Sequence, residues 1–102
     1  MTHGSAPDQR RRFALAKDVV LQVIGEDALV LNLRDETVFS LNPTAVRIAE
    51  LLVASVPVAA AIDALCAEYG ATRDEVSRDV EDLAAALTAR RLLVPIGGEE
   101  SA

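Results

Sequence analysis

The stretch Thr37–Leu52, "TVFSLNPTAVRIAELL", predicts a strand joined to a helix with almost no loop between them. Its first five residues alternate in direction, as the residues of a half-buried strand do. Asn42 is a preferred N-cap residue, because its side-chain oxygen can accept a hydrogen bond from a free amide of the first helical turn. Pro43 suits the first helical position, where no N–H is needed and a helical φ is already set. The stretch therefore fixes where the strand ends and where the helix begins.

Two further strand patterns precede this junction. The segments "DVVLQVIG" (18–25) and "ALVLNLR" (28–34) are rich in Val, Leu and Ile, and the turn-like "GED" separates them. The turn "RDE" (34–36) then leads into the third strand (37–41), in which Phe39 and Leu41 point to one face. Short strands joined by tight turns predict an antiparallel meander of three strands.

Three helix patterns follow the strands. The first runs to about residue 54, and the second starts near Ser55–Pro57 and stops at Gly70, a residue type that favours the left-handed C-terminal position. The third begins with the capping box "TRDE" (72–75) and keeps the helical period to about Arg90. Three strands followed by three helices predict an α+β domain with a winged-helix-like arrangement.

The length of 102 residues is enough for one small domain, which we place at residues 16–96. Residues 1–12 and 97–102 are polar, and residues 1–15 and 97–102 are predicted to be disordered tails. The last segment of the domain, "LLVPI" (92–96), is predicted to pack as a short extended arm. No apolar run approaches the roughly 20 residues of a membrane helix, and the N-terminus lacks the apolar middle of a signal peptide. The single cysteine fits a cytoplasmic protein without an internal disulfide.

Catalytic chemistry has little support in the residues. His3 is the only histidine and falls in the N-terminal tail, so neither a histidine-based triad nor a zinc site can be assembled. Cys66 falls on an apolar helix face, where a packed structural thiol is expected rather than a nucleophile. The five glycines form no phosphate-binding loop. We therefore expect no enzyme, no cofactor and no metal.

Charge decides against one binding function. The helix-turn-helix outline suggests a DNA-binding transcriptional regulator, with the third helix as the recognition helix. That helix carries five acids against two arginines between residues 73 and 82, and the whole chain has a net charge of −6. Two unit charges 4 Å apart interact by about 4 kcal/mol at an effective dielectric constant near 20. Carboxylates driven toward phosphates would be strongly opposed, so nucleic acid is not the expected partner.

The sheet offers another binding function. An edge strand presents unpaired N–H and C=O groups to which an extended peptide can add as a further strand. If the third helix packs back near the strand 37–41, its apolar side forms the wall of a groove. Phe39, Leu41, Val80 and Leu83 have the periodicity of groove residues and equally that of core residues. A plain interaction module with no peptide ligand therefore stays as a further alternative.

A family resemblance bears on this choice. The segments "VFSLNPTAVRIAELL" (38–52), "VAAAIDALCAEYG" (58–70) and "VSRDVEDLAAALTARRLL" (76–93) resemble the PqqD-like family over roughly residues 17–95. The resemblance implies a winged-helix-like domain of three strands and three helices that has no catalytic activity. It implies a recognition element that captures the leader part of a ribosomally made precursor peptide and presents it to a modifying or leader-cleaving enzyme.

The resemblance also implies a binding site, because in the family the leader adds to the third strand against the third helix. Carried over to this chain, the ladder is supplied by the backbone of one strand, and the groove is lined by one helix with two charged residues at its rim. The strand residues are Thr37, Val38, Phe39 and Ser40, the lining residues are Val76, Asp79, Val80 and Leu83, and the rim residues are Arg78 and Asp82.

Two departures from the family pattern concern the pathway. The "Asp-Gly" turn after the first helix is replaced by "VASVP" (53–57), and the "Pro-Glu" pair before the third strand is replaced by "RDE". These departures point away from pyrroloquinoline quinone synthesis. A stand-alone recognition protein of another pathway, such as one that makes a lasso peptide, fits the chain better.

Overall fold

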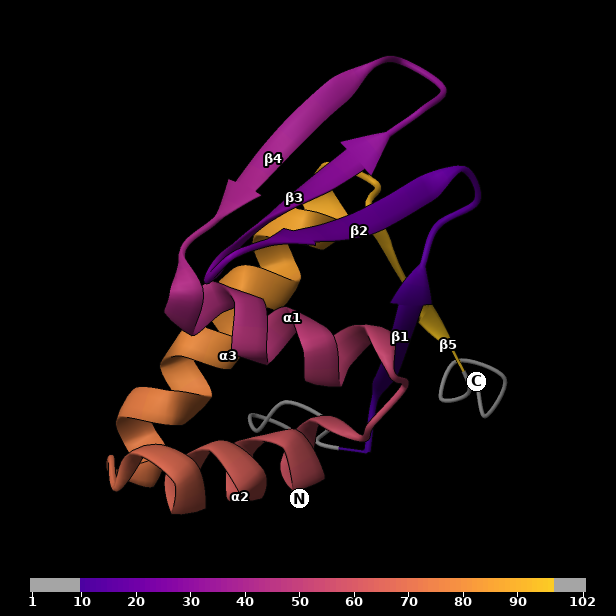
Figure 1. Cartoon of the computed structure of the whole chain (residues 1–102). Helices are drawn as coiled ribbons and strands as arrows, with labels where there is room; N and C mark the ends of the chain where they lie inside the picture. Colours follow the sequence, from indigo (N-terminus) through magenta and orange to yellow (C-terminus); the bar gives the residue numbers. More distant parts are fainter. Residues whose placement is uncertain (1–9, 97–102) are drawn as a thin grey trace.

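A computed structural model describes residues 10–96 of the chain (Figure 1), and residues 1–9 and 97–102 lie outside this description. The predicted α+β class is confirmed, with a three-stranded antiparallel sheet followed by three helices. Two short strands lie at the ends of the domain, of which the sequence indicated only the second, as an extended arm. In chain order the elements are β1 (Arg12–Leu15), β2 (Val19–Ile24), β3 (Asp27–Asn32), β4 (Thr37–Leu41), α1 (Pro43–Val53), α2 (Val58–Tyr69), α3 (Arg73–Ala89) and β5 (Leu93–Ile96).

The three-stranded sheet is a meander with the order β2-β3-β4. Gly25 opens the two-residue loop between β2 and β3 with a φ of 63°, the sign that the favoured hairpin turns require at this position. Glu36 closes the next turn with a φ of 64°. The register of that hairpin pairs Asn32 with Thr37 and Val30 with Phe39. The central strand β3 is therefore paired on both sides, whereas β2 and β4 are the edges of this sheet.

The two framing strands form a sheet of their own. β1 pairs with β5 in the antiparallel sense, from Arg12 opposite Ile96 to Leu15 opposite Leu93. The extended arm predicted for residues 92–96 is thus β5, which has a partner from the other end of the chain. The predicted disorder of residues 1–15 is wrong for Arg12–Leu15, because burial of Phe13 in the core holds this segment in place. The remainder of both predicted tails, residues 1–9 and 97–102, lies outside the described residues.

The helix ends follow their capping residues. The side chain of Asn42 accepts a hydrogen bond of 2.8 Å from the Ala45 amide, which confirms it as the N-cap of α1. Gly70 ends α2 in the left-handed conformation with a φ of 65°. Thr72 and Glu75 form both hydrogen bonds of the predicted capping box at the start of α3. Each cap satisfies terminal backbone groups that the helix itself leaves unpaired.

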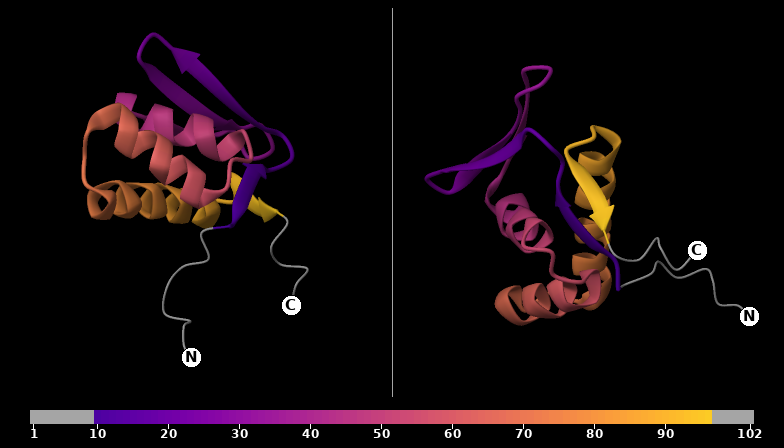
Figure 2. Two further views of the ribbon diagram at one scale, coloured as in Figure 1. Left: turned by 90° about the horizontal axis from the view of Figure 1, so that it is seen from below. Right: turned by 90° about the vertical axis from the view of Figure 1, so that its right-hand side faces the viewer.

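The three helices lie to one side of the three-stranded sheet, and its other face is uncovered by them (Figures 1 and 2). Each helix buries one apolar stripe in a common core.

An ion pair of 2.7 Å between Arg47 and Glu68 joins α1 to α2, and it lowers the pKa of the Glu68 carboxyl because Arg47 donates a hydrogen bond to it. Arg73 forms a further ion pair with Asp63, which joins α3 to α2. The largest fully buried side chains are those of Leu52, Ile62, Leu65, Leu87, Leu93, Val30, Val58 and Val80.

The arginine run at the start of the chain has a partner on α3. The Arg11 guanidinium donates a 2.5 Å hydrogen bond to the carboxylate of Glu81, and it lies 5.8 Å from the centre of the Phe13 ring. Arg11 falls in the tail that the sequence predicts to be disordered, and the structure instead shows it paired with α3. Within residues 10–96, no helix is long and apolar enough to cross a membrane. The same residues contain no group of three or more His, Cys, Asp or Glu side chains that could hold a metal ion.

Candidate peptide-binding site

The strand β4 presents an open edge. Among the described strands it pairs only with β3, so one row of its backbone groups faces away from the sheet. None of its five residues is charged or a proline. Charges and prolines are the usual means by which proteins block the pairing of an edge strand with another chain. The β4 edge is therefore competent for strand addition.

The register shows which residues of β4 supply the outward groups. The Asn32 carbonyl accepts a 2.8 Å hydrogen bond from the Glu36 amide, while the next amide, that of Leu33, donates a 2.9 Å bond toward β2, to the Asp18 carbonyl. Backbone groups alternate in direction along a strand. Asn32 and Val30 therefore direct their backbone groups toward β4, and their register partners Thr37 and Phe39 point back at β3.

Val38 and Ser40 are left to form the free edge. Their backbone N–H and C=O groups point away from β3 by the same alternation, and both side chains are exposed on the uncovered face of the sheet. The prediction that Thr37, Val38, Phe39 and Ser40 all supply a ladder needs one refinement. Val38 and Ser40 offer hydrogen bonds to an added strand, whereas Thr37 and Phe39 direct their side chains toward the helices.

The helix α3 runs beside β4. The Arg90 guanidinium, at the end of α3, lies 4.8 Å from the centre of the half-buried Phe39 ring. Such a distance allows a cation–π attraction of about 0.5–1 kcal/mol at an exposed site. Leu83 stands two helical turns before Arg90, on the same side of the helix, and is half-buried against the core. The side of α3 that reaches Phe39 therefore carries the apolar Leu83 side chain and, at the end of the helix, the positive charge of Arg90.

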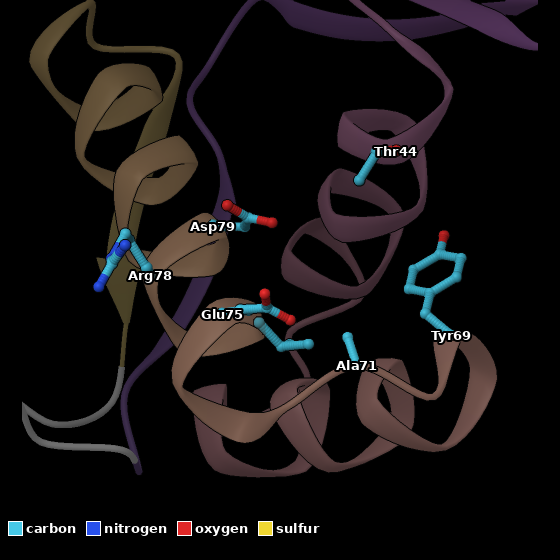
Figure 3. A pocket seen from close by; sticks show the side chains of 7 residues that line it. Thr44, Tyr69, Ala71, Glu75, Arg78 and Asp79 are labelled. Carbon is cyan, nitrogen blue, oxygen red and sulfur yellow. The ribbon is translucent and has the colours of Figure 1, made fainter.

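A cavity of about 370 Å³ lies beside Thr44, in the first turn of the helix that follows β4, and we call it the acidic cavity. It lies between the first turns of α1 and α3 and the last turn of α2 (Figure 3). Figure 3 shows the carboxylates of Glu75 and Asp79 on the side of α3 toward α1, whereas Arg78 points to the opposite side. The lining residues are Thr44, Tyr69, Ala71, Glu75, Val76, Arg78 and Asp79. The lining of this cavity thus carries negative charge.

The structure separates the predicted helix residues into three groups. Val76 and Val80 are buried, with 5% and 0% of their surface exposed, and belong to the core. Leu83 is half-buried, and Asp79 is exposed on the same side of α3. Arg78 and Asp82 are also exposed. Of the four predicted lining residues, Asp79 and Leu83 are thus at least partly exposed, whereas the two valines are buried behind them.

Sequence reasoning missed part of this site. Arg90 contacts Phe39, and Thr44 and Tyr69 line the acidic cavity, yet none of the three was singled out. Arg90 offered one usable signal, because it lies on the same face of α3 as Leu83, seven residues earlier. Thr44 and Tyr69 offered none, since they come together only through the packing of α1 against α2.

The comparison with family models gives a match over residues 27–93 to coenzyme PQQ synthesis protein D (PqqD). The chain belongs to the PqqD family. The match covers β3, β4 and all three helices, so it includes the whole candidate site. The predicted resemblance to the PqqD family is thereby confirmed. A comparison with curated proteins finds no match.

Two solved structures have the fold of this PqqD-family chain. The structure of TbiB1 in complex with the TbiA(beta) leader peptide is 34% identical, covers 78% of this chain and 93% of its own, and superposes with a TM-score of 0.73. A lasso peptide synthetase B1 complexed with the leader peptide is 24% identical, covers 82% of this chain and 99% of its own, and has a TM-score of 0.75. The second likeness concerns the fold alone. No finding favours the DNA-binding alternative for this PqqD-family chain.

Proposed function

We propose that this chain binds the leader region of a ribosomally synthesised precursor peptide as an added strand beside β4. The open β4 edge carries the proposal, because Val38 and Ser40 offer outward backbone groups on a strand whose Phe39 ring is contacted by Arg90 at the end of α3. The likeness to TbiB1, solved with the TbiA(beta) leader peptide, supports a leader as the ligand. The role is one of binding without a catalytic step.

The two kinds of contact have different consequences for recognition. Val38 and Ser40 offer two N–H and two C=O groups, and a hydrogen bond is worth about 0.5–1.5 kcal/mol net. These bonds are the same for any sequence, so they supply affinity. Side chains of the added strand that lie on the Phe39 face would enter the space beside Leu83 and supply specificity.

The biological role follows from holding the leader. A bound leader raises the local concentration of the precursor at a partner enzyme. We propose a leader peptidase or another modifying enzyme as this partner, in the cytoplasm, where Cys66 would stay reduced. The segments "VASVP" and "RDE" depart from the pattern of pyrroloquinoline quinone proteins, and this favours a lasso peptide or a related pathway.

Hydrogen exchange tests the ladder directly, with the TbiA(beta) leader peptide as the probe. In the free protein the amides of Val38 and Ser40 should exchange fast, because they face solvent, whereas the Phe39 amide should exchange slowly. Addition of the leader should slow exchange at Val38 and Ser40 alone among the β4 amides. A peptide with the same residues in scrambled order is the control.

The same complex allows a second measurement in the ligand. Methylation of alternate leader amides should abolish binding in one register and spare it in the other, since only every second amide faces β4. Leader binding that leaves the exchange of both β4 amides unchanged contradicts strand addition. Equal loss of affinity at every methylated position contradicts it as well.

A further inference from the structure

Positive charge is concentrated at the Thr37 end of β4. Four of the ten basic residues of the chain line one cavity of about 310 Å³, although the net charge of the chain is −6. They come from the loop before β2, the β3–β4 turn and the end of α3. We call this the basic cavity, and its lining residues are Ala16, Lys17, Asn32, Arg34, Asp35, Arg90 and Arg91.

The basic cavity also contains an unpaired donor. Asn32 is the one buried polar residue in the described part of the chain, with 8% of its surface exposed. Its side-chain oxygen accepts a 2.9 Å hydrogen bond from the Arg34 amide. Its side-chain NH₂ group has no hydrogen-bond partner within residues 10–96. Buried donors are normally satisfied, so this group calls for an acceptor in the cavity.

The chemistry of the lining selects an anion with flat, paired oxygens. Arginine guanidinium groups bind carboxylates through two parallel hydrogen bonds, and lysine adds a further charge-assisted bond. Asp35 is the single acid among the lining residues, and its Oδ1 already accepts from the Thr37 amide and hydroxyl at 3.2 and 2.7 Å. One carboxylate does not balance four cations, so the cavity retains positive charge for a ligand.

The position of the cavity connects it to the peptide edge. Asn32 is the register partner of Thr37, the first residue of β4, and Arg90 lies over the Phe39 ring. A peptide that adds to β4 in the antiparallel sense ends beside Thr37, and its C-terminal flank continues toward the basic cavity. Antiparallel pairing is the more stable and the commoner arrangement, and it is used by every other pair in this fold.

The segments that flank β4 therefore lie beside cavities of opposite charge. Glu75 and Asp79 line the acidic cavity at the Thr44 end, and the four cations line the basic cavity at the Thr37 end. A peptide with an acid on its C-terminal flank is attracted in one direction along the edge and repelled in the other. Charge of this kind selects orientation and partner more than raw affinity.

We propose that the basic cavity binds an Asp or Glu side chain of the leader, placed within about three residues after the one that faces Thr37, given the reach of an extended chain. The carboxylate accepts hydrogen bonds from the Asn32 NH₂ group and from the arginines, and it sets the direction of the bound strand. This inference rests on the proposed function, because it names a recognition feature of the same ligand.

A displayed library of random 16-residue peptides tests the inference without knowledge of the natural precursor. Selection on the unaltered chain should enrich alternating apolar residues followed at a fixed spacing by Asp or Glu. Selection on Lys17→Glu/Arg34→Glu should replace that acid by Lys or Arg at the same spacing. Neither side chain has a hydrogen-bond or ion-pair partner among the described residues, so the fold should persist.

Two further variants test whether the preference for an acid comes from the basic cavity or from positive charge elsewhere on the chain. Arg12→Glu changes an exposed arginine on β1 and should leave the acidic preference intact. Asn32→Asp keeps the oxygen that accepts from the Arg34 amide but replaces the free NH₂ donor, so it should remove the acidic preference. For the best binder, replacing its acid by the amide should weaken binding to the unaltered chain about tenfold, since hydrogen bonds to charged groups are the stronger ones.

The outcomes distinguish this inference from the proposed function. Ser40→Pro removes an outward β4 amide, so its effect reports strand addition independently of the basic cavity. Selected peptides that Ser40→Pro fails to bind, but that show no acid at a fixed spacing, overturn the inference and leave strand addition standing. The same holds if Lys17→Glu/Arg34→Glu selects unchanged peptides. Peptides that bind Ser40→Pro as tightly as the unaltered chain overturn both proposals, as does a library from which nothing is enriched.

Discussion

The two edges of the three-stranded sheet, β2 and β4, differ in what surrounds them. Both are uncharged and free of proline, and both expose apolar side chains, such as Val23 at 51% and Val38 at 55%. Only β4 has a helix beside it whose arginine covers one of its side chains, namely Phe39. The difference teaches that open backbone groups allow a peptide to pair with the edge, whereas the neighbouring helix provides a surface that the side chains of the peptide can contact. A recognition edge requires both.

The largest expected effect comes from matched prolines in the two edges. Ser40→Pro removes an outward N–H of β4, and Val23→Pro removes an outward N–H of β2, so neither breaks pairing with β3. Ser40→Pro should weaken leader binding by about tenfold to a hundredfold, because the ladder loses hydrogen bonds and the ring obstructs the peptide. Val23→Pro should leave the affinity unchanged. Fluorescence anisotropy of a labelled leader peptide measures the affinity of both variants. Equal losses of affinity would show that the leader does not prefer the β4 edge to the β2 edge.

The next effect concerns the wall of the groove. Leu83→Asp places a carboxylate on the side of α3 that carries Arg90 and should weaken leader binding about tenfold, through the lost apolar contact and the cost of burying charge. Ala85→Asp places the same group on an exposed position of α3 and should have little effect on binding. Circular dichroism checks that both variants keep their helices. A Leu83→Asp chain that simply unfolds would assign this residue to the core instead.

The smallest effect concerns the junction that holds β4. Asn42→Ala and Thr72→Ala each remove an N-cap hydrogen bond, and each should lower the free energy of unfolding by about 1 kcal/mol. Only Asn42 sits directly after β4, so only Asn42→Ala should also weaken leader binding, by a fewfold, as the edge becomes less ordered before binding. Urea denaturation and anisotropy give the two values. An equal loss of affinity in Thr72→Ala would show that leader binding does not depend on the order of the β4–α1 junction.

Local signals predicted much of the fold. The pair Asn42–Pro43 and the capping box at Thr72 place the starts of α1 and α3, because a cap acts within one helical turn. The strand β1 escaped prediction for the opposite reason. Its four residues follow a run of arginines, and their partner β5 lies some eighty residues later in the chain, so no local pattern reveals the pairing.

The candidate site was predicted in outline and needed the structure for its details. That β4 and α3 bind a peptide stays a prediction, and two of the predicted lining residues, Val76 and Val80, are buried in the core. Val76, Val80 and Leu83 follow one apolar pattern along α3, and only the packing of the helix shows that the valines are buried and Leu83 is half-buried. The basic cavity had no sequence signal at all. Lys17, Arg34 and Arg90 come from three distant segments, and only the closed fold brings their charges together.

The pairing of β1 with β5 has a consequence for building larger proteins. Because Arg12 faces Ile96, the described chain enters and leaves the domain at one corner. Figure 1 places that corner on the side of the molecule away from β4. Neighbouring entry and exit points are what domain insertion and circular permutation require. The domain could therefore be spliced into a loop of an unrelated enzyme by two short connections at that corner, leaving β4 and its flanking cavities open to solvent.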